Sequence, residues 1–108
     1  YPFRTDHPQH SLALRQMKAG GAIITASLKG NQKQTYSVCK SLRYFTMAES
    51  LGGIESLVCH PATMTHASVP AETKAKIGID DCLVRFSVGC ETLSDLSADL
   101  NEALNQLQ

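Results

Sequence analysis

Leucines that recur every three or four residues near the end of the chain predict an amphipathic helix. The spacing is that of one helical face, and the residues are Leu93, Leu96, Leu100, Leu104 and Leu107. Asp95, Asp99 and Glu102 fall on the opposite side, and Thr92 with Asp95 approximates a capping box. We therefore expect a long C-terminal helix that buries the leucines and exposes the carboxylates.

Alternating apolar and polar positions predict strands over residues 21–28 and 82–89. In the second segment Val84 and Phe86 share one face, whereas Arg85 and Ser87 lie on the other. Two shorter strand-like pieces, 43–48 and 55–60, are separated by the sequence ESLGGI. These segments supply the strands of one small sheet.

Three further helices are expected, one before the first strand and two between strands. Asp6 or His7 can cap the first, which runs to about Met17, and Asn31 can cap a second that continues to Leu42. A short third helix starts at Pro70 and stops at Gly78. Each helix has one apolar stripe, so the expected fold class is α+β: a small, mostly antiparallel sheet with helices covering one face.

Composition and charge restrict the partners of the chain. Its 108 residues, 43% of them hydrophobic, suit one compact domain. Ten Lys and Arg balance ten Asp and Glu, so no strong field favours nucleic acid or an anionic membrane surface. No apolar run approaches the roughly 20 residues of a membrane span. We expect a cytoplasmic protein that binds neither nucleic acid nor membrane.

The cysteines and the first two histidines do not predict a metal site. The four cysteines contain no Cys-x-x-Cys pair and lie among apolar neighbours, as buried reduced thiols do; they are Cys39, Cys59, Cys82 and Cys90. His7 and His10 are one helical turn apart. Pro8 between them and the lack of a nearby carboxylate favour a surface pair over a chelating pair.

His60 and His66 flank the sequence PATMT, where Pro61 and several hydroxyl groups predict a structured loop with hydrogen-bonding side chains. No Gly-x-Ser-x-Gly, dinucleotide-binding or phosphate-loop motif is present in the sequence. A catalytic triad is therefore not indicated.

Arg85 is the charged residue whose position invites two interpretations. Alternation places it away from the helix-covered core, and arginine is mostly solvent-exposed in any case. The second interpretation is that this face of the sheet meets another domain or a ligand. A guanidinium on a rigid strand suits a carboxylate or a phosphate, because its paired donors match two oxygens at once.

Three motifs in fixed order resemble those of a known enzyme family. They are AESLGG-x-ESL from residue 48, HPA-x-MTHAS from residue 60 and GI-x-x-x-LVR-x-SVG from residue 78. Together with HPQHSLALRQM at residues 7–17 they resemble the C-terminal region of the Cys/Met-metabolism family of pyridoxal-phosphate (PLP) enzymes. That family includes cystathionine γ-synthase and cystathionine γ-lyase, and the resemblance covers essentially the whole chain.

The resemblance implies a substrate-binding site. It implies that Arg85 binds the α-carboxylate of an amino-acid substrate and that the turn containing Ser50 and Leu51 approaches the same end of the substrate. The sequence AESLGG with Glu49 resembles that of the γ-synthase and γ-lyase members, whereas β-lyases usually show Ser-Trp-Gly-Gly. The resemblance also implies that Thr65 lies near the active site. Gly52 and Gly53 suit a sharp turn close to a ligand, although a plain inter-strand turn also explains them.

The resemblance also implies what lies outside this sequence. Family members hold PLP as a Schiff base on a lysine of a larger N-terminal domain. Lys74 is not a candidate for that lysine, because its place near the end of a short helix is typical of an exposed cation that complements the helix dipole. We therefore expect residues 1–108 to be the C-terminal (small) domain of a fold-type I PLP enzyme, without catalytic residues, without the cofactor domain and inactive by itself.

The implied intact enzyme is a homotetramer of the transsulfuration pathway that acts on a homoserine ester, cysteine or cystathionine. The residues do not separate synthase from lyase. The alternative is a stand-alone interaction module that associates with full-length subunits.

Overall fold

Four strands form one mixed sheet in the computed structural model, which describes residues 3–107. The strand order is β1-β4-β3-β2, and β4 pairs antiparallel with both β1 and β3, whereas β2 and β3 are parallel. The strands are β1 (Ile23–Ser27), β2 (Thr46–Met47), β3 (Leu57–Cys59) and β4 (Leu83–Ser87). The predicted α+β class and the mostly antiparallel sheet are confirmed.

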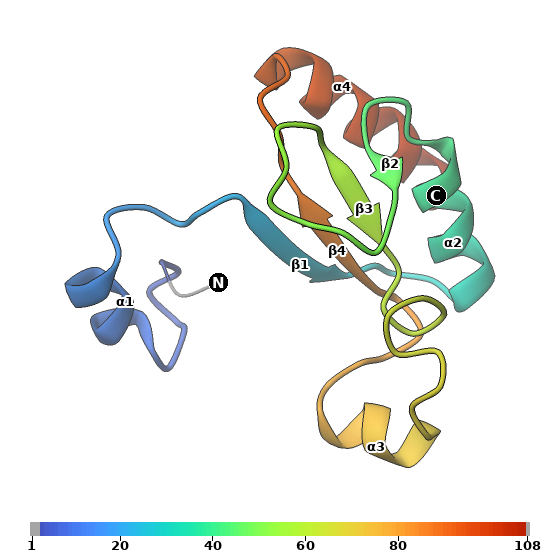
Figure 1. Cartoon of the computed structure of the whole chain (residues 1–108), viewed down its shortest axis with the longest axis horizontal. Helices are drawn as coiled ribbons and strands as arrows, with labels where there is room; N and C mark the ends of the chain where they lie inside the picture. Colours follow the sequence, from blue (N-terminus) through green and yellow to red (C-terminus); the bar gives the residue numbers. More distant parts are fainter. Residues whose placement is uncertain (1–2, 108) are drawn as a thin grey trace.

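Helices α2 and α4 lie side by side over one face of this sheet (Figure 1). The core fills the space between the two layers and includes Val38 of α2, Val84 and Phe86 of β4, and Leu96 of α4. The helices are α1 (His10–Gln16), α2 (Gln32–Ser41), α3 (Ala71–Lys76) and α4 (Leu93–Leu104), which a 3-10 turn, η1 (Asn105–Leu107), follows.

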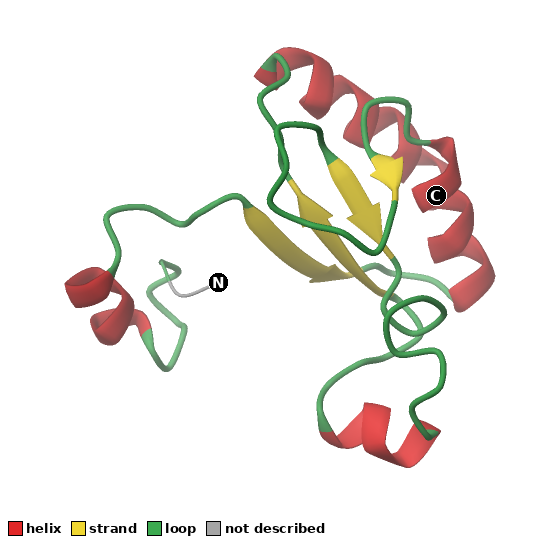
Figure 2. Ribbon diagram, in the orientation of Figure 1, coloured by secondary structure: helices red, strands yellow, loops and turns green. Residues whose placement is uncertain are grey.

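Local sequence signals explain where α2 and α1 begin. Asn31 caps α2 in a full capping box with Gln34, as the sequence predicts for its first residue. Helix α1 starts later than expected, after Gln9: the Asp6 carboxylate accepts from Arg4 (2.7 Å), and His7 Nδ1 accepts from the Gln9 N–H (3.1 Å) ahead of the helix. Both α1 and α3 lie outside the two packed layers (Figure 2).

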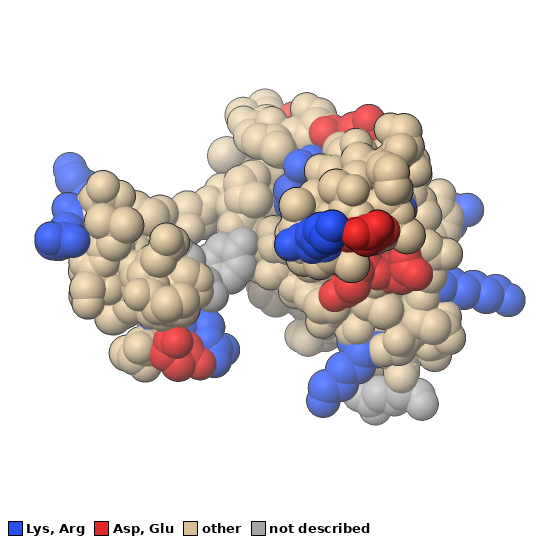
Figure 3. Space-filling model, turned by 90° about the horizontal axis from the view of Figure 1, so that it is seen from below, with Lys and Arg blue, Asp and Glu red and all other residues tan. Residues whose placement is uncertain are grey.

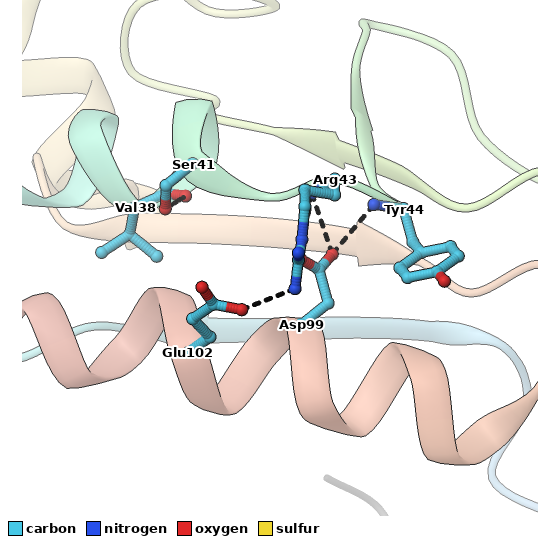
Figure 4. A network of polar contacts seen from close by, with 6 residues as sticks. All are labelled: Val38, Ser41, Arg43, Tyr44, Asp99 and Glu102. Atoms are coloured by element: carbon cyan, nitrogen blue, oxygen red, sulfur yellow. Dashed lines mark hydrogen bonds and ion pairs between the residues drawn. The ribbon is translucent and has the colours of Figure 1, made fainter.

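Three expectations for α4 are wrong. Leu93 at its first turn is 77% exposed, and Thr92 precedes the helix without a side-chain cap. Asp99, expected in solvent, is 2% exposed and accepts hydrogen bonds from the backbone N–H groups of Arg43 (3.0 Å) and Tyr44 (2.9 Å), as Figure 4 shows. Its carboxylate satisfies the donors of the segment that leaves α2, so the polar residue belongs to the interior.

The cysteines divide between core and surface. Cys39 and Cys59 are buried as expected, Cys82 is half-buried, and Cys90 is exposed, which contradicts the prediction for that residue. Burial raises the pKa of the Cys39 thiol to about 11, so it remains protonated and unreactive at neutral pH.

The described surface carries mixed charge. On the face shown in Figure 3, Lys and Arg side chains are interspersed with Asp and Glu side chains. In the part of the chain that the structure describes, no helix is both long enough and apolar enough to cross a membrane.

Candidate functional site

Residues 48–56, here called the glycine loop, connect β2 to β3 and cross the sheet face that α2 and α4 leave uncovered (Figure 1). Gly52 adopts a φ of 78°, a conformation that residues with a Cβ rarely take. Its N–H donates to Ser87 Oγ at 2.8 Å. The glycine therefore turns the loop back onto β4, so the loop lies against the strand that carries Arg85.

Arg85 stands at the centre of the sheet, in register with Thr25 of β1 and Cys59 of β3. Its neighbours Val84 and Phe86 face the core and are 0% and 7% exposed. The guanidinium Nη2 lies 3.2 Å from the carbonyl oxygen of Glu49 and 3.4 Å from that of Ser50. Two neutral acceptors thus fix one edge of a cation on a central strand.

The rest of the guanidinium remains available to a ligand. Of its five N–H donors, those on Nε and Nη1 make no hydrogen bond within residues 3–107, and no Asp or Glu of that range forms an ion pair with Arg85. A half-buried arginine without a protein carboxylate attracts an external anion, and its planar fork matches a carboxylate.

The structure brings together three of the other predicted site residues but not the fourth. Glu49 and Ser50 approach Arg85 through their carbonyl oxygens, while Leu51 is 51% exposed beside them. Thr65 lies in the turns that follow β3, where its hydroxyl is 2.8 Å from His66 Nδ1. No hydrogen bond within the described chain joins Thr65 to Arg85 or to the glycine loop.

The residues that anchor the glycine loop are not among the predicted site residues. Ser56 is fully buried, and Glu91 accepts from both its N–H and its hydroxyl at 2.7 Å. The Gly89 N–H donates to the same hydroxyl oxygen at 2.9 Å. Strand alternation could have identified Ser87, which shares a face with Arg85, but no local pattern connects Ser56 to a carboxylate 35 positions later.

The pKa of Glu91 lies below its ordinary value of 4.5 because the Ser56 N–H and hydroxyl both donate to the ionised carboxylate. A lowered folded-state pKa stabilises the fold at pH values above the unfolded pKa, and this contribution is lost as the pH falls through the folded value. We expect Glu91→Gln to abolish this loss. Urea midpoints measured between pH 7 and pH 3 will fall less steeply with acid than in the unchanged chain.

The control is Glu72→Gln, because Glu72 is 81% exposed and forms an i,i+4 pair with Lys76 on α3. Its acid dependence should match that of the unchanged chain. Equal acid dependence in the Glu91 and Glu72 variants would show that the anchor does not couple protonation to folding.

His60 is held by its neighbours in a way that leaves no free ring nitrogen. The ring is fully buried, with Nε2 3.0 Å from the Asp81 carbonyl oxygen and Nδ1 2.7 Å from the Thr63 hydroxyl. A carbonyl only accepts, so Nε2 donates to the Asp81 oxygen, and Nδ1 pairs with the Thr63 hydroxyl. His60 therefore holds the predicted loop in place through both ring nitrogens.

The described residues bring no lysine to the candidate site. Lys74 donates to the Ala62 carbonyl oxygen, and Lys76 pairs with Glu72 on the surface of α3. No lysine within residues 3–107 makes a hydrogen bond to Arg85 or the glycine loop, and the described residues contain no cluster of three or more His, Cys, Asp or Glu that could hold a metal ion. No cofactor step is assigned to these side chains.

The fold and the site define a small α+β domain in which a glycine-rich loop lies over an arginine on the central strand, and that arginine forms no ion pair within residues 3–107. The chain belongs to the family of Cys/Met metabolism PLP-dependent enzymes, whose pattern it matches over residues 1–105.

Relatives from several organisms agree with this membership. The cystathionine gamma-lyase of Dictyostelium discoideum and the cystathionine beta-lyase of Coxiella burnetii are each 49% identical to it, over 98% and 96% of this chain. The crystal structure of cystathionine gamma synthase from Xanthomonas oryzae in complex with cystathionine is 47% identical and superposes over 99% of the chain with a TM-score of 0.91.

The chain spans only part of these proteins. It covers 27% of the length of the two lyases and 28% of the chain in the Xanthomonas structure. Gamma- and beta-lyases match it at equal identity, so overall similarity does not select one branch.

Proposed function

We propose that residues 1–108 form the substrate-binding C-terminal domain of a PLP-dependent cystathionine γ-synthase or γ-lyase, and that Arg85 binds the α-carboxylate of its amino-acid substrate. The observation that carries this proposal is the state of the Arg85 side chain. It is fixed by the carbonyl groups of Glu49 and Ser50, and it has donors to spare and no carboxylate partner within residues 3–107.

Other residues of the proposed site surround the substrate. We propose that the Ser50 hydroxyl and the exposed Leu51 side chain contact the amino-acid end of the substrate and that Glu49 lies beside them. Thr65 contributes only if the ligand or another part of the protein bridges it to Arg85. The gamma synthase in the Xanthomonas complex binds cystathionine, which supports a sulfur amino acid as the ligand here.

The cofactor chemistry requires residues beyond this chain. PLP would supply the electron sink that amino-acid side chains lack, and we propose that an N-terminal domain of the same polypeptide holds it. The substrates are a homoserine ester, cysteine or cystathionine, and the intact enzyme is a cytoplasmic homotetramer. Glu49 favours the γ branch over the β-lyases.

Assays of the complete protein test the proposal and separate its two versions. A γ-lyase will consume cystathionine with PLP, whereas a γ-synthase will form cystathionine from cysteine and a homoserine ester. A complete protein that binds PLP but catalyses neither reaction contradicts the assignment and favours an interaction module.

The 108-residue chain alone should not bind PLP covalently at one site. We expect incubation with PLP and reduction with borohydride to leave no stoichiometric adduct on a single lysine, because Lys74 donates to the Ala62 carbonyl oxygen, Lys76 pairs with Glu72, and no lysine within residues 3–107 makes a hydrogen bond to Arg85. Peptide mapping by mass spectrometry is the measurement. The complete protein, treated identically, is the positive control, and stoichiometric labelling of one lysine of the isolated chain would refute this part of the proposal.

A further inference from the structure

The glycine loop is fastened at two separate points, one on β4 and one on the segment 89–91 that follows it. Near its middle, the Gly52 N–H donates to Ser87 Oγ at 2.8 Å. At its end, both oxygens of Glu91 accept from Ser56, at 2.7 Å each. Ser56 and Ser87 are 0% and 2% exposed, so these bonds lie inside the protein, where an unmade hydrogen bond is costly.

Backbone contacts tighten the second anchor. The Cys90 N–H donates to the Ile54 carbonyl oxygen at 2.8 Å, and the Gly89 N–H donates to the Ser56 hydroxyl. A Cβ on Gly89 would overlap the Ile54 carbonyl oxygen and lie 2.5 Å from a Glu91 carboxylate oxygen. The loop therefore approaches the end of β4 as closely as glycine permits.

These anchors have a direct consequence for Arg85. The two carbonyl groups that accept from its Nη2 belong to Glu49 and Ser50, just before the Gly52 anchor of the same loop. A loop displaced from β4 carries those acceptors with it, and the guanidinium loses the contacts that orient its remaining donors. Bidentate recognition of a carboxylate depends on that orientation.

We infer that Glu91 and Ser87 are positioning residues of the carboxylate site, which act on Arg85 through the glycine loop without touching the substrate. The inference rests on the proposed function of Arg85. Both oxygens of Glu91 are engaged by Ser56, so its charge is directed at the anchor rather than at a ligand.

The test uses the complete protein and two substrates, cystathionine and its α-carboxamide. Glu91→Gln removes the charge from the second anchor, and Ser87→Ala removes the acceptor of the first. A lost hydrogen bond corresponds to about three- to tenfold in an equilibrium constant. We expect the preference for carboxylate over carboxamide in kcat/KM to fall by that factor. The loss should appear in KM, with kcat changed less than about twofold if only binding geometry is affected.

The control and the outcomes separate the possible explanations. Glu72→Gln, an equivalent change on the exposed surface of α3, should leave the preference unchanged. A purely structural role lowers stability without moving the preference, so an unaltered preference in a folded Glu91 or Ser87 variant overturns the inference for that residue. If Glu91→Gln does not fold, Ser87→Ala decides alone.

Arg85→Ala in the same assay distinguishes this inference from the proposed function. If the preference for carboxylate survives in Arg85→Ala, Arg85 does not bind the carboxylate and the proposed function is wrong. If the preference is lost in Arg85→Ala but kept in both anchor variants, only the positioning role of Glu91 and Ser87 is wrong.

Discussion

Arg85→Ala in the complete protein should lower kcat/KM for cystathionine by at least about 30-fold. Truncating one partner of a sheltered, hydrogen-bonded charge pair costs roughly 2 to 5 kcal/mol, and each 1.4 kcal/mol is about tenfold. Arg85→Lys should recover little, because an ammonium group cannot both reach the carbonyl groups of Glu49 and Ser50 and present a planar fork to the substrate. Steady-state kinetics of the three proteins provide the measurement.

The bound-cofactor spectrum should be the same in all three proteins, because the proposed cofactor site lies outside this chain. Arg43→Ala is the matched control: the Arg43 side chain is 66% exposed and pairs with Glu102 and, at 3.7 Å, with Asp99 on the helix-covered side. That variant should keep nearly full activity. Near-normal kcat/KM in Arg85→Ala, or loss of cofactor with unchanged substrate affinity, would restore the interpretation of Arg85 as a solvent-facing residue.

The face of the sheet on which Arg85 lies could be predicted from the sequence, because successive side chains along a strand point to opposite faces. Val84 and Phe86 are the apolar neighbours that must enter the core, so Arg85 must leave on the opposite face. The same kind of local rule located α2, whose Asn31 cap is encoded within four residues. Short-range geometry was therefore sufficient for the faces and for most elements.

What faces Arg85 could not be predicted from local rules. The carbonyl groups that hold it belong to residues 35 and 36 positions earlier in the chain, and backbone carbonyls leave no trace in a residue pattern. The parallel pairing of β2 with β3 was also not anticipated. The family resemblance supplied the association of Ser50 with Arg85, but it did not identify Glu91 or Ser56 as the loop anchor.

For Asp99, residue type predicts the wrong exposure, whereas helical spacing predicts the right one. It lies three positions after Leu96 and four before Ala103, both of which are buried, so helical geometry places it on the inner face of α4. Its charge suggested the solvent side instead. The interior accepts this carboxylate because the turn after α2 presents two N–H groups to it, and a buried carboxylate must be hydrogen-bonded.

Asp99→Ala should therefore lower the free energy of unfolding by about 3 kcal/mol. Hydrogen bonds to a charged group contribute roughly 1.5 to 3 kcal/mol, and their loss leaves both N–H donors without an acceptor. Asp99→Asn keeps one acceptor oxygen and should cost about half as much. The measurement is urea unfolding followed by far-UV circular dichroism at one protein concentration.

Glu102→Gln is the control for these two variants. Glu102 lies on α4 one turn after Asp99, and its exposed carboxylate pairs with Arg43. A surface ion pair contributes at most about 1 kcal/mol, so the urea midpoint of this variant should move little. Asp99 supports the segment 42–45, which leads from α2 into β2 and contains the buried Phe45. If Asp99→Ala were no less stable than Glu102→Gln, water would be replacing the carboxylate, and α4 would hold that segment through apolar packing alone.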